Sequence, residues 1–186
     1  MRIITGSAKG LQLKAPRGLN TRPTADKIKG AIFNILGTLV VDAVVLDLFA
    51  GTGNLGLEAL SRGADKAIFV DHTSTSTSII KENAIHTKLF ARCEIYRADA
   101  ARSLDKLILQ GQRFDLIFCD PPYNQGYVGQ VLSRIDGSDI LNDEGVVILE
   151  HSRHELIDCQ WKNINIMRSE RYGETMVSFL SQKQEQ

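Results

Sequence analysis

Cysteine and long apolar runs are scarce in this sequence, and each scarcity excludes a class of protein. The 186 residues contain three cysteines, an odd number without the spacing of metal ligands, which argues against a disulfide framework and for a reduced, intracellular location. No stretch approaches the roughly 18 consecutive apolar residues that span a bilayer. The first residues, Met1 to Gly6, lack the apolar core of a signal peptide. We therefore expect a cytoplasmic protein with no membrane partner.

The chain also has no net charge, since 22 basic residues balance 22 acidic ones, but the charges are unevenly distributed. Residues 1–30 hold seven basic side chains and one acidic side chain, so the rest of the chain has an acidic surplus of six. A basic segment on an acidic body is typical of a polyanion-binding protein, although a solvated segment without a partner is the alternative. We expect residues 1–40 to form an RNA-binding extension. Its expected contacts are Arg2, Lys9, Arg17, Arg22, Thr24 and Lys27.

Strands alternate with helices from residue 43 onward. Short apolar runs such as Val44–Phe49 are typical of strands buried on both faces. The alternation predicts an α/β domain at 41–182, doubly wound and Rossmann-like, with a mostly parallel sheet and an antiparallel hairpin at its C-terminal edge. Before it we expect a small hairpin over 2–17 and a helix from Thr24 or Asp26 to Leu39. The expected strands are 44–49, 66–70, 93–98, 114–119, 145–150, 162–168 and 175–180, and the expected helices are 54–62, one ending near 88, 101–109 and 127–135.

A GxGxxG pattern, Gly51, Gly53 and Gly56, follows the first expected strand. Glycines there let the backbone turn tightly and approach a ligand. Asp71 ends the second strand, where a carboxylate accepts hydrogen bonds from ribose hydroxyls, and Asp99 follows the third, facing an adenine; a helix N-cap is the alternative for each. The pattern predicts a nucleoside cofactor, either NAD or S-adenosylmethionine. The expected cofactor contacts are Asp47, Phe49, Gly51, Thr52, Gly53, Asp71, Asp99 and Ala100.

The fourth expected strand runs directly into Asp120-Pro121-Pro122-Tyr123. Two prolines end the strand and make a rigid turn, and a proline carbonyl stays free as an acceptor. An exocyclic base amine is a poor nucleophile, but Asp120 and the Pro121 carbonyl can accept its two N–H groups and stabilise the charge that develops on nitrogen. Tyr123 offers a ring on which a base can stack. These four residues predict methyl transfer from S-adenosylmethionine, with neither a metal nor a covalent nucleophile.

With both motifs in this order, the chain resembles the class I methyltransferases that carry (D/N)PPY, and more closely the RsmD family of bacterial 16S ribosomal RNA guanine-N2 methyltransferases. The resemblance runs from residue 2 to about 180. It implies methylation of a guanine N2 in 16S rRNA, with assembled ribosomal protein helping to form the substrate, so we expect a small-subunit assembly particle as the partner of a monomeric enzyme. The matching segments are Arg2–Gly10, Thr21–Thr24, Asp47–Gly53, Leu55–Gly63, Asp120–Tyr123 and Tyr172-Gly173.

Three other functions compete with this interpretation. An adenine-N6 methyltransferase uses the same Asp-Pro-Pro-Tyr chemistry, but 186 residues leave no room for a separate DNA-recognition domain. An NAD-dependent oxidoreductase has no role for Asp120 or Tyr123, and an RNA-binding assembly factor has no need of an intact Asp120. A metal site at His151, His154 and Cys159 lacks a supporting ligand pattern, so we expect a loop after the fifth strand there. Cys119 and Trp161 are expected to pack in the core.

Overall fold

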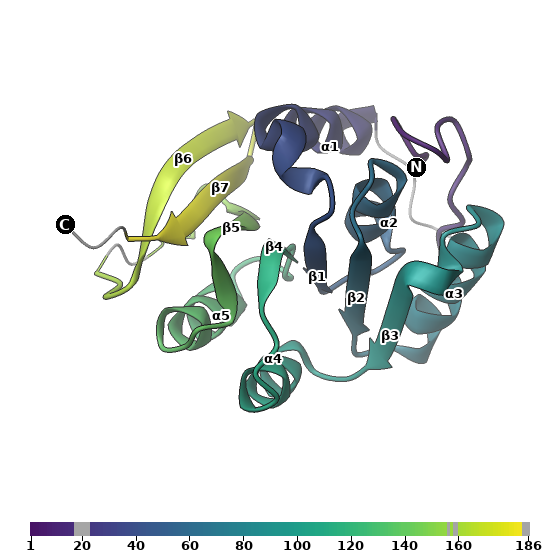
Figure 1. The fold of residues 1–186 in the computed structure, drawn as a ribbon. Helices are drawn as coiled ribbons and strands as arrows, with labels where there is room; N and C mark the ends of the chain where they lie inside the picture. The colour runs from purple at the N-terminus through teal and green to yellow at the C-terminus, as the bar shows by residue number, and fades with distance from the viewer. Residues whose placement is uncertain (17–22, 156, 158–159, 184–186) are drawn as a thin grey trace.

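The computed structural model describes residues 1–16, 23–155, 157 and 160–183. Its strands form one seven-stranded sheet in the order β3-β2-β1-β4-β5-β7-β6 (Figure 1). The five strands from β3 to β5 run parallel, and β7 pairs antiparallel with both β5 and β6. This confirms the doubly wound sheet with an antiparallel edge. The strands are β1 (Val44–Leu48), β2 (Lys66–Asp71), β3 (Cys93–Arg97), β4 (Phe114–Cys119), β5 (Leu141–Ser152), β6 (Ile164–Tyr172) and β7 (Thr175–Gln182).

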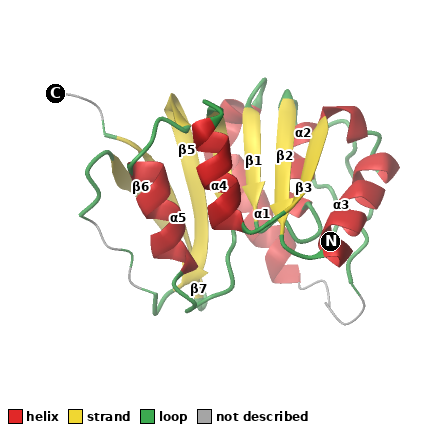
Figure 2. Ribbon diagram, turned by 90° about the horizontal axis from the view of Figure 1, so that it is seen from below, coloured by secondary structure: helices red, strands yellow, loops and turns green. Residues whose placement is uncertain are grey.

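Helices cover both faces of the sheet. α1, α2 and α3 pack on one face, and α4 and α5 on the other, where they lie in front of the strands in Figure 2. Each face therefore has its own apolar core, which is the arrangement that βαβ connections impose. No helix of the described residues is long and apolar enough to cross a membrane. The helices are α1 (Pro23–Leu36), α2 (Asn54–Ser61), α3 (Ser74–His86), α4 (Ala100–Leu109) and α5 (Tyr127–Asp136), with 3-10 turns at Gly37–Val40 and Phe90–Arg92.

Several elements differ from the sequence-based expectation at their ends, among them β6, which covers Ile164–Tyr172 instead of 162–168. α1 begins at Pro23 rather than at a cap on Thr24 or Asp26, since proline has no N–H that the first turn would leave unpaired. It ends at Leu36, and a 3-10 turn replaces its last expected residues. β5 begins at Leu141 instead of Gly145, and its pairing with β4 shifts register between Phe114 and Leu116. The apolar periodicity of one strand does not reveal a bulge in its pairing with a neighbouring strand.

The core residues expected outside the motifs are partly confirmed. Cys119 is buried, and burial raises the pKa of its thiol well above the ordinary value, so it is a small packed side chain. Trp161 packs partly buried against the core beneath α4 and α5. His151 lies within β5 rather than in a loop after it, and its ring nitrogens bond the Ser152 carbonyl and the Ser178 hydroxyl. Among the residues that the structure describes, no cluster of His, Cys, Asp and Glu has the arrangement of a metal site.

The N-terminal segment packs on the body of the molecule beside α2 and α3. A single bridge between Arg2 and Gln12 closes it into a short hairpin, and Ile3 and Leu13 are buried in the same core as α1 and α2. Farther along, the Asn83 side chain of α3 bonds the backbone of Lys14 through both its oxygen and its nitrogen. The hairpin is thus fixed to the sheet domain at several points along its length.

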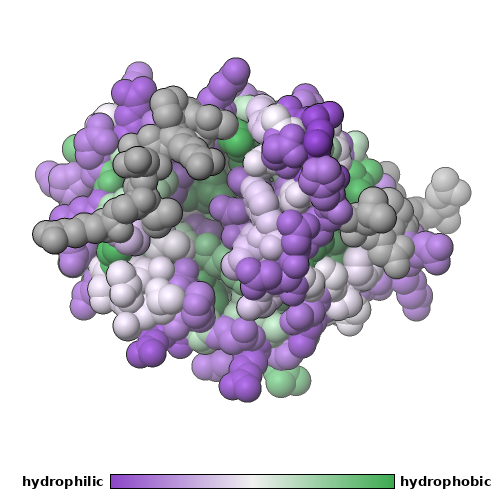
Figure 3. Space-filling model, turned by 180° about the vertical axis from the view of Figure 1, so that it is seen from behind, coloured by the Kyte–Doolittle hydropathy of each residue, from purple (hydrophilic) through white to green (hydrophobic). Residues whose placement is uncertain are grey.

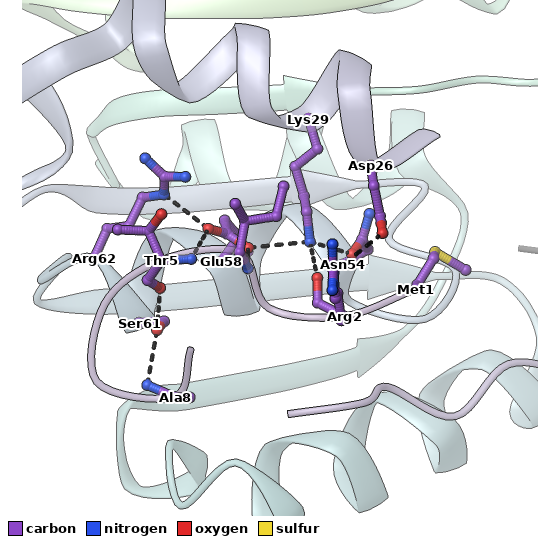
Figure 4. Close-up of polar contacts among 12 residues, drawn as sticks. Met1, Arg2, Thr5, Ala8, Asp26, Lys29, Asn54, Glu58, Ser61 and Arg62 are labelled. Atoms are coloured by element: carbon purple, nitrogen blue, oxygen red, sulfur yellow. Dashed lines mark hydrogen bonds and ion pairs between the residues drawn. The ribbon is translucent and has the colours of Figure 1, made fainter. Parts of the chain in front are cut away.

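Glu58 of α2 is the main anchor of this segment (Figure 4). Its carboxylate is fully buried and accepts hydrogen bonds from the backbone N–H groups of Ile4 (2.7 Å) and Thr5 (3.0 Å). It also pairs with Lys29 of α1 at 3.0 Å and with Arg62 at 2.8 Å. One carboxylate thereby joins the N-terminal hairpin, α1 and α2.

Lys29 is the buried partner in this network, with its side chain 1% exposed. Its ammonium group donates to the Arg2 carbonyl (2.6 Å) and to Asn54 Oδ1 (2.7 Å) as well as pairing with Glu58. Burial lowers the pKa of Lys29, and the negative charge of Glu58 opposes this shift. The three contacts satisfy the three N–H donors of a lysine, so the charge is buried without an unpaired proton.

The Lys29–Glu58 pair should contribute far more to stability than an exposed pair. We expect Lys29→Met to lower the free energy of unfolding by about 3 kcal/mol, because it leaves a buried carboxylate with one partner fewer. Lys66→Met is the matched control, since Lys66 and Glu94 are each 39% exposed, and it should cost less than about 1 kcal/mol. Denaturant unfolding measures both variants, and equal losses would contradict the proposed role of the buried pair.

Candidate active site

A pocket of about 420 Å³ opens at the carboxyl ends of the central strands. The loop after β1, the turn after β4, the end of β5, the start of β7 and one side of α1 all contribute to its wall. A smaller pocket of about 110 Å³ lies beside it, after β2 and β3, and Phe49 lines both. The strand order reverses between β2-β1 and β1-β4, which is where doubly wound sheets bind ligands. On the face opposite to the view of Figure 1, apolar residues show chiefly in a hollow between hydrophilic regions (Figure 3).

The glycine loop after β1 is held in a conformation that side chains rarely adopt. Gly51 and Gly53 have φ angles of 57° and 76°, and even Phe49 has a φ of 61°. Gly56 is needed for space, since a Cβ there would lie 2.4 Å from the Phe69 ring. The Phe49 ring packs edge-on against Tyr127, with the ring centroids 5.3 Å apart. The conformation of the loop is therefore set by its backbone angles and its packing, rather than being that of an unconstrained strand–helix connection.

Asp71 holds this loop from the end of β2. Its Oδ2 accepts from the Gly51 N–H at 2.9 Å, and its Oδ1 accepts from the N–H of Thr73 at 2.9 Å. The side chain lines the smaller pocket together with Asp99 and Ala100. Asp99 also caps α4 by accepting from the Arg102 N–H at 3.1 Å, so for this residue the N-cap alternative and the pocket position both hold. The three residues expected at the nucleoside end of a cofactor thus share one pocket.

Asp47 and Thr52 connect the loop to its surroundings. The buried Asp47 carboxylate accepts from the Gly56 N–H at 2.9 Å, and burial raises its pKa to about 8, with that hydrogen bond opposing the shift and the charge of Asp71 adding to it. The Thr52 carbonyl accepts from Asn83 at 2.9 Å. Because Asn83 also bonds Lys14, the N-terminal hairpin and the glycine loop share one partner. Both Asp47 and Thr52 line the larger pocket.

The Asp120–Tyr123 turn faces the same pocket as the glycine loop. Asp120 and Tyr123 line the larger pocket, Pro122 lines the smaller one, and Pro121 is buried. Asp120 lines the pocket with part of its surface open to solvent. The desolvation of its carboxyl group within the pocket, together with the charges of Glu150 and Asp47, raises the pKa of Asp120 well above its ordinary value.

Glu150 is one pocket residue that the sequence alone did not lead us to expect. Tyr123 donates its O–H to Glu150 Oε1 at 2.8 Å and lies 3.2 Å from the Thr175 hydroxyl of β7. Burial raises the pKa of Glu150, and burial also raises the pKa of Tyr123. A charged residue after the four apolar residues of β5, Val146 to Leu149, was the available signal, because the same position at the end of a strand identified Asp71 and Asp120.

Lys29 and Asn54 of the pocket wall were also missed. Lys29 precedes Ile32, Phe33 and Leu36 by three, four and seven residues, so helical periodicity places it on the buried stripe of α1. The expectation instead treated it as part of the basic surface charge. A lone lysine on an apolar stripe was the signal for a buried ion pair.

The expected RNA contacts are only partly described by the structure. Arg2, Lys9 and Lys27 are exposed, and Arg2 Nε lies 3.7 Å from Asp26. Arg17 and Arg22 lie outside the described residues, as does the side chain of Thr24, whose backbone belongs to α1. Lys9 and Lys27 form no ion pair within the described part of the chain, so their charges are open to a partner.

The strand order, the glycine loop after β1 and the Asp-Pro-Pro-Tyr turn after β4 define a Rossmann-like methyltransferase fold, and comparison with known proteins agrees. The family described as "Conserved hypothetical protein 95" matches residues 1–181, and the chain belongs to this family, which includes the RsmD methyltransferases.

Three relatives illustrate the similarity. The Bacillus subtilis protein "Putative rRNA methyltransferase YlbH" is 39% identical over 98% of this chain and 100% of its own length. Escherichia coli "Ribosomal RNA small subunit methyltransferase D" is 32% identical over 81% of this chain and 74% of its own. The solved structure "Putative methyltransferase yhhF from Escherichia coli" superimposes with a TM-score of 0.83 at 28% identity, over 100% of this chain and 99% of the other.

The raised pKa of Asp47 predicts a pH-dependent loss of stability. A carboxyl whose folded pKa is about 8 instead of 3.8 favours the protonated, folded form at low pH, and this contribution is lost as the pH rises toward 8. Asp47→Asn stays neutral and keeps an acceptor for the Gly56 N–H. We therefore expect the melting temperature of the wild type to fall relative to that of Asp47→Asn between about pH 5 and about pH 8. A constant difference across this range would show that Asp47 is ionised throughout.

Proposed function

We propose that this chain transfers a methyl group from S-adenosylmethionine to the N2 amine of a guanine in 16S ribosomal RNA. The observation that carries the proposal is the shared pocket: Asp120 and Tyr123 face the same space as the glycine loop. A methyl donor held at the loop and a base held at the turn would therefore meet without a domain movement. The family membership and the ribosomal RNA methyltransferases among the relatives support the choice of substrate.

The two pockets suit the two halves of the cofactor. S-adenosylmethionine would place its adenosine in the smaller pocket, with the ribose hydroxyls at Asp71 and the adenine at Asp99 and Ala100. Its methionine part would extend past Phe49 toward Gly51, Thr52 and the larger pocket. The cofactor supplies an activated methyl group, so the protein has mainly to hold and orient two reactants.

The Asp-Pro-Pro-Tyr turn would bind and orient the amine. Asp120 and the Pro121 carbonyl accept its two N–H groups, which directs the nitrogen lone pair toward the methyl group and stabilises the positive charge that develops. Tyr123 stacks on the base, and its hydroxyl bonds to Glu150 and Thr175 keep the ring in place. The raised pKa of Asp120 also suits a group that takes up a proton from the product amine.

Residues 1–40 are proposed to bind RNA, with 41–182 as the methyltransferase domain. The exposed charges of Arg2, Lys9 and Lys27 lie on the hairpin and on α1, which also forms one wall of the pocket through Ile28 and Lys29. RNA held there would lie next to the site. We further propose that the protein acts as a monomer on an assembling small subunit in the cytoplasm.

Mass mapping of methylated nucleotides tests the proposal directly. Small-subunit particles from a strain that lacks this protein are incubated with the protein and labelled S-adenosylmethionine, and the labelled nucleotide is identified. The expected product is N2-methylguanine at one position of 16S rRNA. N6-methyladenine would establish the alternative amine substrate, and transfer with no preference for ribosomal RNA would overturn the proposal.

Removal of the Asp120 carboxylate should affect the reaction more than cofactor binding. We expect Asp120→Ala to cut the single-turnover methyl-transfer rate by at least about 100-fold, the scale of losing one preorganised group, with little change in S-adenosylmethionine affinity by calorimetry. Asp143→Ala, which removes a carboxylate that is 92% exposed on β5, is the control. A wild-type rate in Asp120→Ala would sink the assigned role.

Removal of two exposed charges tests the RNA-binding extension. The double variant Lys9→Ala, Lys27→Ala should weaken RNA binding and flatten the plot of log affinity against log salt by roughly 0.7–0.9 for each phosphate that a lysine no longer neutralises. Cofactor affinity and melting temperature should stay unchanged because both side chains are exposed. Lys88→Ala, an exposed charge outside the extension, should leave the slope as it is. An unchanged slope in the double variant would show that neither lysine binds phosphate.

A further inference from the structure

Glu150 lies next to Asp120 on the side of the sheet where β4 ends. β4 and β5 are parallel, and Cys119 pairs with Leu149 at the end of their shared register. The next residue in each case carries a carboxyl group, Asp120 directly after β4 and Glu150 within β5, and neighbouring strands lie about 4.8 Å apart. Both side chains line the larger pocket. Two acceptor groups therefore face one pocket.

One oxygen of Glu150 is already occupied and the other is available. Oε1 accepts the Tyr123 O–H at 2.8 Å. Among the described residues, no hydrogen bond reaches Oε2, although the side chain is half-buried and lines the pocket. A half-buried carboxylate oxygen without a protein donor is suited to a donor from a ligand.

We propose that Glu150 selects guanine by accepting its N1–H while Asp120 accepts an N–H of the adjacent N2 amine; this rests on the proposed function. Guanine carries N1–H and the N2 amine side by side on its Watson–Crick edge. Adenine carries an acceptor at N1, next to its own amine, and an acceptor facing a carboxylate oxygen is repelled. The pair Asp120 and Glu150 therefore matches guanine and rejects adenine, although the Asp-Pro-Pro-Tyr turn alone serves either amine.

The pKa shifts of the two carboxyl groups are consistent with a ligand that supplies hydrogen-bond donors to both. Burial and mutual repulsion raise the pKa of Asp120, and burial raises that of Glu150. Asp47 and Tyr123 also face this space, and Lys29, whose ammonium group Glu58 and Asn54 occupy, lines its wall. A base edge that presents two adjacent N–H donors would stabilise both carboxylates in their charged form.

The role differs from that of Tyr123, which Glu150 also contacts. If Glu150 only positioned the Tyr123 ring, its loss would slow all substrates alike. A direct bond to N1–H instead makes its effect depend on the base. Substrates that differ at N1 therefore separate the two roles.

The test uses small subunits reconstituted with 16S rRNA in which the mapped guanine is replaced by 2-aminopurine. This base keeps the N2 amine but has an acceptor at N1 and no 6-oxo group. We expect the wild type to methylate it at least about tenfold more slowly than guanine, the scale of one hydrogen bond to a charged group. Glu150→Gln should lose about tenfold or more on guanine and prefer 2-aminopurine, because its amide donates to N1 while its oxygen still accepts from Tyr123.

Two control variants and a second substrate complete the design. Tyr123→Phe should slow both substrates and keep their ratio, and Glu144→Gln, an exposed carboxylate on the same strand, should change neither rate. If Glu150→Gln does not fold, 1-methylguanine in wild-type reactions still decides, since it keeps the oxo group and the N2 amine and lacks N1–H. Equal wild-type rates on guanine and 1-methylguanine, or an unchanged ratio in folded Glu150→Gln, would overturn the inference. Absence of any transfer to guanine would instead overturn the proposed function.

Discussion

The buried carboxylate of Glu58 is the interaction on which the arrangement around the site depends. It receives two backbone N–H groups of the N-terminal hairpin, the ammonium group of Lys29 and the guanidinium of Arg62. A buried carboxylate is costly unless donors surround it, so these segments must come together when α2 packs on the sheet. Lys29 in turn bonds Asn54, the first residue of α2 after the glycine loop. The described part of the proposed RNA-binding extension is therefore joined by hydrogen bonds and ion pairs to the helix that follows the glycine loop.

The topology of the sheet places the candidate site residues at one edge. Because β1 to β5 are parallel, the residues that follow them meet at one edge, and the reversal of strand order beside β1 leaves a gap there that loops line. The loop after β1 and the turn after β4 follow adjacent strands, which pair from Val45 with Leu116 to Leu48 with Cys119. The glycine loop and the Asp-Pro-Pro-Tyr turn, the proposed cofactor-binding and base-binding segments, are thus neighbours because they follow paired strands. Phe49 lines both pockets and marks the boundary between them.

Three carboxyl groups that are difficult to ionise line this pocket. Burial raises the pKa of Asp47, Asp120 and Glu150, and the charges of Glu150 and Asp47 raise that of Asp120 further. Perturbed titration of this kind is common at functional sites, because folding alone gives no reason to bury like charges together. Asp47 accepts from the Gly56 N–H and Glu150 accepts from the Tyr123 O–H, but all three carboxyl groups also line the pocket, where a ligand with N–H groups would supply further donors.

Local sequence determined the features that depend on neighbours along the chain. The sheet, most helix ends, the glycine loop and the Asp120 turn follow from apolar runs, glycines and prolines, which act through backbone conformation and period. The tertiary structure alone decided which distant groups became partners. Glu150 joins Tyr123 because β5 pairs beside β4, and Lys29 became a core residue because Glu58 lies opposite it. Helical periodicity places Lys29 on the buried stripe of α1, but the identity of its partner depends on contacts between segments far apart in the chain, and periodicity carries no information about those.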